Sequence, residues 1–129
     1  MRASLMLLLA VAGSVQAQSA PDGKTIFGKN CAACHQASGA GIPGAFPALK
    51  ANVFLQGEPD PVIATVLKGR AGMPAFAASL DDAQLATVLT YARSAWGNKA
   101  GAISVEQTAA VRNAANAPAS NQPKSTIIH

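Results

Sequence analysis

The clearest periodic pattern of apolar and polar positions lies in the second half of the chain. Apolar side chains recur there at intervals of three and four residues, the spacing that gathers them on one face of an α-helix. They are Leu85, Val88, Leu89, Ala92 and Trp96. Asp81 stands before this run and Gln84 follows it by three positions, a pair that caps the first turn of a helix reciprocally. Gly97 supplies a stop signal. We therefore predict a helix between Asp81 and Gly97.

Three weaker helical patterns accompany this one, and we place them at residues 22–32, 60–68 and 104–113. Asp22 is a suitable N-cap for the first of them. The second begins with Asp60 and Pro61, an N-cap residue followed by a proline at the first helical position. Ser104 starts the third, with Gln107 in the position of a capping box. The alternation of apolar and polar residues that is typical of strands is weak, so helices are the predicted regular structure.

The connection between residues 36 and 59 is long and has no clear period. Its glycines and prolines are Gly39, Gly41, Pro43, Gly44, Pro47, Gly57 and Pro59. More than about 20 residues without regular structure is unusual inside a small domain. Such a loop makes sense if it wraps a large rigid ligand. The predicted fold class is therefore all-α, with three to four short helices and long loops folded around that ligand.

The two ends of the chain differ from its middle. Arg2 and an apolar run from Leu5 to about Val15 precede small residues that end at Ala17, the pattern of a secretory signal peptide. The run is about half the roughly 20 residues of a membrane-spanning helix, although a short anchor or a buried helix is the alternative. The end of the chain is rich in alanine, asparagine, proline and serine, which predicts a flexible tail. We assign residues 1–17 to the signal peptide, 18–112 to one domain and 113–129 to the tail.

Charge and size narrow the function classes further. The 129 residues include 10 lysines and arginines against 6 aspartates and glutamates, for a formal net charge of +4. This mildly basic balance lacks the dense basic clusters of a nucleic-acid-binding protein. A domain of about 90 residues is marginal on its own apolar core and commonly needs a covalent link or a cofactor inside it.

The strongest chemical motif is Cys31-Ala-Ala-Cys34-His35, which contains the only two cysteines of the chain. Two thiols one helical turn apart can each form a thioether with a haem vinyl group, and the next histidine can then bind the iron. A thioredoxin-type dithiol expects a βαβ context, which the sequence lacks. Structural zinc needs four ligands, and only His129 is left to supply the fourth. A disulfide would close a loop too small to stabilise much. We favour one covalently attached haem c, with these three alternatives kept open.

A second iron ligand is expected at Met73. It is the only methionine left once residues 1–17 are removed, and Gly72 and Pro74 flank it. A lone methionine usually packs in a core. Here the neighbouring glycine and proline would make a poor core helix but a stiff loop that presents a sulfur atom. Because cytochromes c use histidine and methionine together, we predict His35 and Met73 as the two axial ligands.

Together these residues resemble a class I cytochrome c. The C-terminal half is similar to the cytochrome domains and subunits that accompany bacterial quinoprotein dehydrogenases, and the resemblance covers roughly residues 22–112. Gly23 and Phe27 stand at that family's spacing before the first haem cysteine. The resemblance implies that they pack against Val88 and Tyr91 on a later helix.

The resemblance implies further residue roles. The segment Pro47-Ala48-Leu49 is similar to the family's P-x-L segment, whose proline carbonyl orients the haem histidine. The Trp96-Gly97-Asn98 run strengthens the comparison with dehydrogenase cytochromes. In a class I fold, four basic residues are expected to border the exposed haem edge and to face an acidic patch on a partner. They are Lys24, Lys29, Lys68 and Arg70. Haem propionates and solvent are the alternative neighbours of Lys68 and Arg70.

A histidine and a methionine fill both axial positions of a haem iron, which leaves none open for oxygen or peroxide. We therefore predict a periplasmic one-electron carrier that is not an enzyme. Its expected partners are a dehydrogenase as electron donor and an oxidase or another cytochrome as acceptor. The protein itself is expected to be a monomer or to form transient complexes with these partners. Nucleic acid is not expected as a partner, nor is a membrane span after signal cleavage. The alternative is a tightly bound cytochrome c subunit of a periplasmic dehydrogenase or reductase. A haem enzyme or gas sensor would require Met73 to be displaced.

Overall fold

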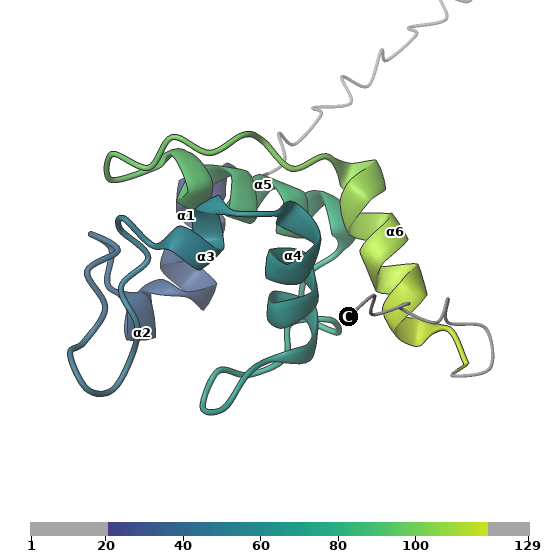
Figure 1. Ribbon diagram of the computed structural model, residues 1–129, viewed down its shortest axis with the longest axis horizontal. Coiled ribbons are helices and arrows are strands. Elements are labelled where there is room, and N and C mark those ends of the chain that lie inside the picture. Colours follow the sequence, from purple (N-terminus) through teal and green to yellow (C-terminus); the bar gives the residue numbers. More distant parts are fainter. Residues whose placement is uncertain (1–20, 119–129) are drawn as a thin grey trace, which may run out of the picture.

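The computed structural model describes residues 21–118, and its regular structure within that range consists of helices (Figure 1). The helices are α1 (Gly23–Asn30), α2 (Ala32–His35), α3 (Val53–Gln56), α4 (Pro59–Lys68), α5 (Asp82–Ser94) and α6 (Val105–Asn116). The expected all-α fold is thereby confirmed. None of these helices is long and apolar enough to cross a membrane. The expected signal peptide, residues 1–17, and residues 119–129 of the expected tail lie outside the described range.

The helix starts predicted at three aspartate and serine residues are confirmed. The Asp81 carboxylate accepts a hydrogen bond from the Gln84 backbone at 2.8 Å, and the Gln84 side chain accepts one from the Asp81 backbone at 3.1 Å. Asp22 accepts from the Thr25 backbone at 2.8 Å at the start of α1. Ser104 accepts from a backbone N–H at 3.1 Å at the start of α6. These bonds satisfy N–H groups that have no partner inside the helix.

The predicted start of the second helix is wrong by two residues. Helix α4 begins at Pro59, with Glu58 as an N-cap that makes no side-chain bond. Either proline suits the first turn of a helix, and the earlier one takes that position. Asp60 therefore lies within the first turn, where its carboxylate accepts a hydrogen bond of 3.0 Å from the side chain of Gln107 on α6. Gln107 thus joins two helices instead of completing a capping box.

Three other boundaries differ from the prediction. Trp96 is not part of the preceding helix, because α5 ends at Ser94 and Trp96 adopts a φ of 55° in the left-handed region. The predicted irregular connection contains the short helix α3, whose N-cap Asn52 accepts from the Leu55 backbone at 2.9 Å. Helix α6 continues to Asn116, so the first residues of the expected tail are helical.

Helices α1 and α5 cross closely at Gly23. A Cβ atom on Gly23 would lie 2.5 Å from the Cβ of Tyr91 and 2.6 Å from the carbonyl oxygen of Thr87, which only glycine avoids. One turn further along, the ring of Phe27 lies 5.7 Å from that of Tyr91 and 5.1 Å from that of Trp96. The packing of Gly23 and Phe27 against α5, which the family resemblance implied, is confirmed. This crossing places the end of α1, and the cysteine motif after it, beside α5.

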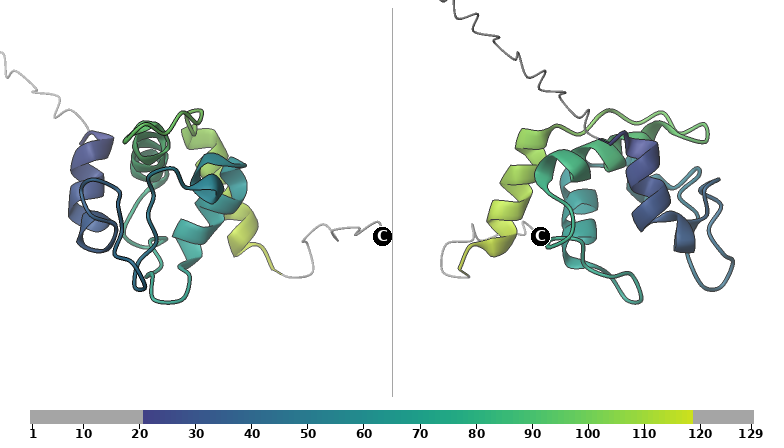
Figure 2. Two further views of the ribbon diagram at one scale, coloured as in Figure 1. Left: turned by 60° about the vertical axis from the view of Figure 1, so that its left-hand side comes forward. Right: turned by 180° about the vertical axis from the view of Figure 1, so that it is seen from behind.

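The remaining helices complete a small core. Its fully buried side chains come mainly from α4 and α5, and the largest apolar ones are Ile63 and Leu85. Helix α6 packs against α4 and α5 (Figures 1 and 2). Arg112 on α6 donates to the carboxylate of Asp82 at 2.6 Å and to the carbonyl oxygens of Ala77 and Leu80. It thereby ties the last helix to the segment that leads into α5.

Substitution of the crossing glycine tests this arrangement. Gly23→Ala is expected to lower the free energy of unfolding by about 1–3 kcal/mol, because two backbones must separate to admit a methyl group. Gly28→Ala is the matched control on the same helix, since a Cβ there meets nothing within 4 Å. It should be neutral or stabilising by up to about 1 kcal/mol, through helix propensity. Urea denaturation of the haem-loaded proteins measures both, and equal stability of the two variants would contradict the crossing.

Candidate functional site

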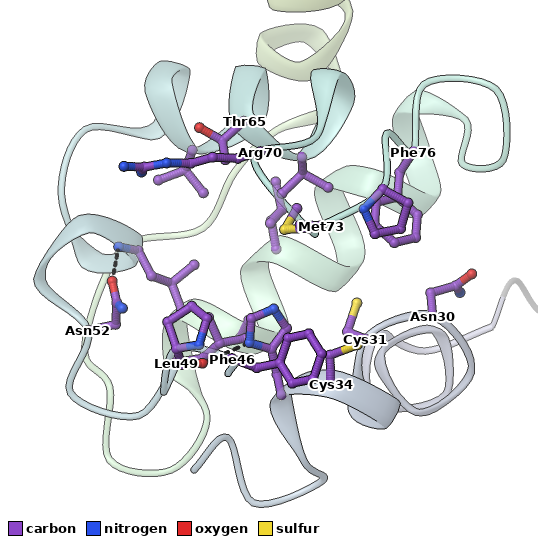
Figure 3. A pocket seen from close by; sticks show the side chains of 18 of the residues that line it. Asn30, Cys31, Cys34, Phe46, Leu49, Asn52, Thr65, Arg70, Met73 and Phe76 are labelled. Atoms are coloured by element: carbon purple, nitrogen blue, oxygen red, sulfur yellow. Dashed lines mark hydrogen bonds between the residues drawn. The ribbon is translucent and has the colours of Figure 1, made fainter. Parts of the chain in front are cut away.

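The main cavity of the described residues has a volume of about 470 Å³ and lies between the loops that connect the helices. This is within the range of about 300–1,000 Å³ that is usual for ligand and cofactor sites. Helices α1 to α5 all contribute to its walls, together with the loops around residues 45–52 and 70–76. Most of the lining is apolar. Figure 3 shows the sulfur atom of Met73 on one side of the cavity, with Cys34 and Phe46 on the facing side.

The cysteine motif forms one wall. Helix α1 ends at Asn30, Cys31 is its C-cap, and the next four residues form the single turn α2, which brings Cys34 and His35 to the cavity. Both thiols are free and half-buried. Burial, and to a lesser extent the neighbouring Cys34, raises the pKa of the Cys31 thiol to about 11. A redox-active dithiol needs a thiol of lowered pKa, so this environment disfavours the thioredoxin-type alternative.

The zinc alternative also finds no support in this geometry. Among residues 21–118, no group of three or more histidine, cysteine, aspartate or glutamate side chains is arranged to hold a metal ion. His129, which sequence reasoning considered as a fourth ligand, lies outside the described range.

His35 is held in a defined orientation. Its Nδ1 atom lies 2.8 Å from the carbonyl oxygen of Pro47. Because a carbonyl oxygen only accepts hydrogen bonds, Nδ1 carries the proton in this pair and donates it. The other ring nitrogen, Nε2, then has a free lone pair. The contact that the family resemblance implied between Pro47 and His35 is therefore present in the structure.

The loop that contains Pro47 is itself fastened to the end of α5. Asn98, which is buried, donates from its side-chain amide to the carbonyl oxygens of Leu49 at 3.0 Å and Ala92 at 2.9 Å. The side-chain oxygen of Asn98 accepts from the backbone of Ala51 at 2.9 Å. An asparagine amide has four hydrogen-bonding sites. Three bonds here join the Asn98 side chain to two segments of the chain. Asn98 thus holds both ends of the segment that follows Pro47.

Trp96 makes a second attachment for the same loop. Its indole N–H donates to the carbonyl oxygen of Ala37 at 2.9 Å. A Cβ atom on Gly39, which has a φ of 67°, would lie 2.5 Å from the Trp96 ring. Sequence reasoning placed Trp96 on the apolar face of the helix before Gly97, and it quoted Asn98 only for its resemblance to dehydrogenase cytochromes. The sequence signal that could have found them is a pair of side chains with hydrogen-bond donors close after the end of a helix.

Met73 is presented by a tight turn. Arg70 and Met73 exchange two backbone hydrogen bonds of 3.1 and 2.9 Å. Gly69 starts the turn with a φ of 75°, and a Cβ atom there would lie 2.6 Å from the carbonyl oxygen of Met73. Further along, the Phe76 backbone donates to the carbonyl oxygen of Val66 on α4 at 3.0 Å. The half-buried Met73 side chain lines the cavity, as the structure in Figure 3 shows.

A few polar groups lie at one side of the cavity. Arg70, Thr65 and Asn52 are among its lining residues, and Figure 3 shows them away from the cysteines. Lys68, which was expected beside Arg70, is exposed and does not line the cavity.

These donors suit a haem. Two thiols, an imidazole with a free Nε2 and a thioether sulfur line one apolar cavity, and these are the groups that attach and ligate haem in c-type proteins.

Comparison with known proteins decides the family. Residues 18–91, more than half of the chain, match the family model described as cytochrome c oxidase, cbb3-type, subunit III. The chain belongs to the c-type cytochromes. As a member of this family it carries a covalently attached haem c.

Relatives of this cytochrome differ in size. Cytochrome c-552 of Thermus thermophilus is 36% identical, over 76% of this chain and 74% of that protein. The cbb3-type cytochrome c oxidase subunit CcoP of Azospirillum brasilense is 36% identical over 67% of this chain. The gluconate 2-dehydrogenase cytochrome c subunit of Pantoea cypripedii is 33% identical over 70% of this chain. The cytochrome spans only 32% and 24% of the lengths of these last two proteins. The similarity to dehydrogenase cytochromes noted in the sequence is confirmed.

Removal of the Asn98 amide tests how the Pro47 loop of this cytochrome is held. Asn98→Ala removes the partner of the Ala51 N–H and of the Ala92 carbonyl oxygen, at about 1–3 kcal/mol for each that stays buried and unsatisfied, while the Leu49 carbonyl oxygen keeps a bond of 3.3 Å from the Asn52 backbone. We expect the free energy of unfolding to fall by roughly 3 kcal/mol. Asn113→Ala, at an exposed position of α6, is the control and should change it by less than about 0.5 kcal/mol. An Asn98→Ala protein as stable as the control would show that the Pro47 loop keeps its conformation without the Asn98 amide.

Proposed function

We propose that this cytochrome is a one-electron carrier whose haem is attached through Cys31 and Cys34 and ligated by His35 and Met73. It acts as a redox protein and not as an enzyme. The observation that carries the proposal is that the His35 ring and the Met73 side chain line the same apolar cavity. Haem iron with such a ligand pair exchanges one electron at a time, and the thioether sulfur favours the reduced form.

Each residue of the proposed site has a separate task. The Cys31 and Cys34 thiols lie one helical turn apart, the spacing needed for two thioether links. The Pro47 carbonyl accepts the Nδ1 proton of His35, which fixes the ring orientation and makes Nε2 the ligand atom. The turn between Gly69 and Met73 limits the positions that the sulfur can take.

The apolar lining also serves electron exchange. Val88, Leu89 and Ala92 of α5 and Val62 of α4 form cavity walls without polar side-chain atoms. Such walls exclude water, and the hydrophobic surroundings of a metal site control its solvent access and its redox potential.

We further propose that the protein is exported and works in the periplasm. The support is the sequence pattern of residues 1–17, which is typical of a secretory signal peptide.

A permanently bound cytochrome subunit is the second candidate. It is favoured by the gluconate dehydrogenase and CcoP relatives, both of which are named as subunits. Size-exclusion chromatography of the native protein separates the two candidates, since a carrier elutes alone and a subunit elutes with its complex.

The first prediction of the proposed function concerns Met73. Met73→Ala should remove the sulfur-to-iron absorption band of the ferric protein and allow the ferrous protein to bind carbon monoxide, because one axial position opens. Met73→His is the matched control, which should lose the same band but exclude carbon monoxide. Absorption spectra of the two variants measure both effects. A Met73→Ala protein that keeps the wild-type band would show that another residue is the ligand.

The charges of the protein are unevenly placed, which bears on its partners. All 6 acidic residues lie at an N-cap or in the first turn of a helix: Asp22, Glu58, Asp60, Asp81, Asp82 and Glu106. Helices α1, α4 and α6 all start at the upper side of Figure 1 and run towards the lower side. The loops that bear the cavity lie at that lower side, where α1 and α4 end. No acidic residue occurs among those that line the cavity.

Basic residues mark the opposite ends of two of these helices. Lys29 is in the last turn of α1, and Lys68 is in the last turn of α4, followed by Arg70 at the cavity. Lys24 was expected with them but lies in the first turn of α1, about one helix length away. We therefore define the basic rim as Lys29, Lys68 and Arg70, and propose that it meets an acidic patch on the redox partner. A dehydrogenase donor and an oxidase or cytochrome acceptor are the proposed partners, met in small, transient interfaces.

The second prediction concerns this rim. Lys29→Glu, Lys68→Glu and Arg70→Glu together should slow reduction by the partner at low salt, and the difference from wild type should shrink as salt screens the charges. Stopped-flow kinetics over a range of ionic strength measures this.

Lys24→Glu with Lys99→Glu is the control, because both lysines are exposed but belong to neither of the loops at the cavity. Its effect should be small at every salt concentration. Equal rates for the rim variant and wild type at low salt would mean that the partner docks through apolar contacts.

A further inference from the structure

Arg93 is a buried cation with no acidic partner. Only 4% of its surface is exposed, and it is the one charged residue among the buried residues of the described chain. Its guanidinium donates to three backbone carbonyl oxygens, those of Gly101 at 2.9 Å, Leu55 at 2.6 Å and Gly57 at 2.9 Å. The single ion pair of the described residues is the one between Arg112 and Asp82. Because arginine does not lose its proton in proteins, this buried group carries a full positive charge.

The charge lies directly behind the wall of the haem cavity. Leu55, whose carbonyl oxygen makes the shortest bond to the guanidinium, lines the cavity, and so does Ala92, the residue before Arg93. Leu89, one helical turn earlier on α5, lines it too. Arg93 therefore adjoins residues of the apolar cavity wall both along α5 and through the Leu55 backbone.

Carbonyl dipoles satisfy the guanidinium without neutralising it. A carboxylate partner would cancel most of the field at a distance, as Asp82 at the other end of α5 does for Arg112. Three carbonyl groups lower the cost of burying the cation, but their own net charge is zero. The two nearest charged residues along the chain segments that Arg93 binds are Glu58 and Lys99, both of which are exposed and therefore screened by water.

We propose that Arg93 raises the reduction potential of the haem in this cytochrome by acting on it through the apolar wall. A fixed positive charge in a medium of low dielectric constant favours the redox state that carries one positive charge less, which is the ferrous state. Arg93 is a tuning residue and touches neither the haem nor the ligands. The inference rests on the proposed function, since it requires that the haem iron cycle between two oxidation states.

Two substitutions separate the charge of Arg93 from its packing. Arg93→Gln keeps an amide that can donate to the carbonyl oxygens but has no charge. Arg93→Lys keeps the charge, in a group whose pKa falls when it is buried. Arg112→Gln is the matched control, because it removes an arginine of the same charge that is partly exposed to water and does not line the cavity. Spectroelectrochemical titration of the haem-loaded proteins measures each potential, with the sulfur-to-iron band recorded to check that ligation is unchanged.

We expect Arg93→Gln to lower the ratio of reduced to oxidised protein at a fixed applied potential roughly tenfold, which corresponds to about 59 mV for one electron. Arg112→Gln should change it far less. Arg93→Lys should start near wild type at about pH 5 and fall towards the Arg93→Gln value as the pH rises and the lysine loses its proton. Wild type and Arg93→Gln should lack this change with pH. The pH titration of Arg93→Lys therefore compares a charged with a neutral side chain within one folded protein.

Two results would overturn the inference. One is an Arg93→Gln potential equal to that of wild type. The other is an Arg93→Lys potential that stays at the Arg93→Gln value at every pH, since a shift independent of charge reflects loosening of α3. If Arg93→Gln does not fold, the pH step of Arg93→Lys alone decides. Failure of the proposed function looks different, because wild type itself would then show no reversible one-electron titration.

Discussion

The close contact of α1 with α5 at Gly23 is the constraint on which the rest of the structure depends. Because the two backbones touch, the last turn of α1 is held against α5, and the cysteine motif that follows is brought to the cavity wall. Helix α5 also supplies apolar residues that line the cavity, among them Val88, Leu89 and Ala92. One side chain larger than hydrogen at this crossing would move both halves of the site relative to each other. The place of the cysteine motif at the cavity is therefore set by helix packing and not by the motif alone.

The loops around the cavity have little regular structure, and side chains with polar groups fasten them instead. Asn98 and Trp96 hold the loop that carries Pro47, and Arg93 holds the end of α3. Arg112 does the same for the segment after the methionine turn. Asn98, Arg93 and Arg112 each donate to two or more backbone carbonyl oxygens, and Trp96 donates to one. This satisfies buried backbone groups that would otherwise be costly, and it orders segments that a chain of this size cannot pack by apolar contacts alone.

An apolar cavity of this size would be unfavourable in a small protein if nothing occupied it. The covalent haem of this family supplies the missing apolar contacts, so the cofactor serves as part of the core. The proposed electron transfer follows from the same arrangement. The lining is mostly apolar, Arg70, Thr65 and Asn52 lie away from the cysteines, and no acidic residue lines the cavity.

Local sequence signals were sufficient to predict the capped helix starts at Asp22, Asp81 and Ser104, because a cap depends on residues three positions apart. The cysteine motif and Met73 were likewise predicted to lie at one site, and both line the cavity. The start of α4, the end of α5 and the helix α3 were missed. Pro59 and Pro61 both suit the start of α4, and the earlier one takes that position. Trp96 stands at helical spacing but lies outside α5, where its ring packs on Phe27 and Gly39.

What only the tertiary structure decided is the set of contacts between residues far apart in the chain. Arg93, Asn98 and Arg112 are ordinary polar residues on a helix or a loop when read in sequence. Their partners lie 38, 49 and 35 positions away, so no local pattern announces that they bind backbone carbonyl oxygens. The sequence by itself determined the capped helix starts, since these depend on residue type and short spacing, and the family resemblance pointed to the crossing at Gly23. The folded chain decided which backbone groups lacked a partner, and therefore which side chains became structural.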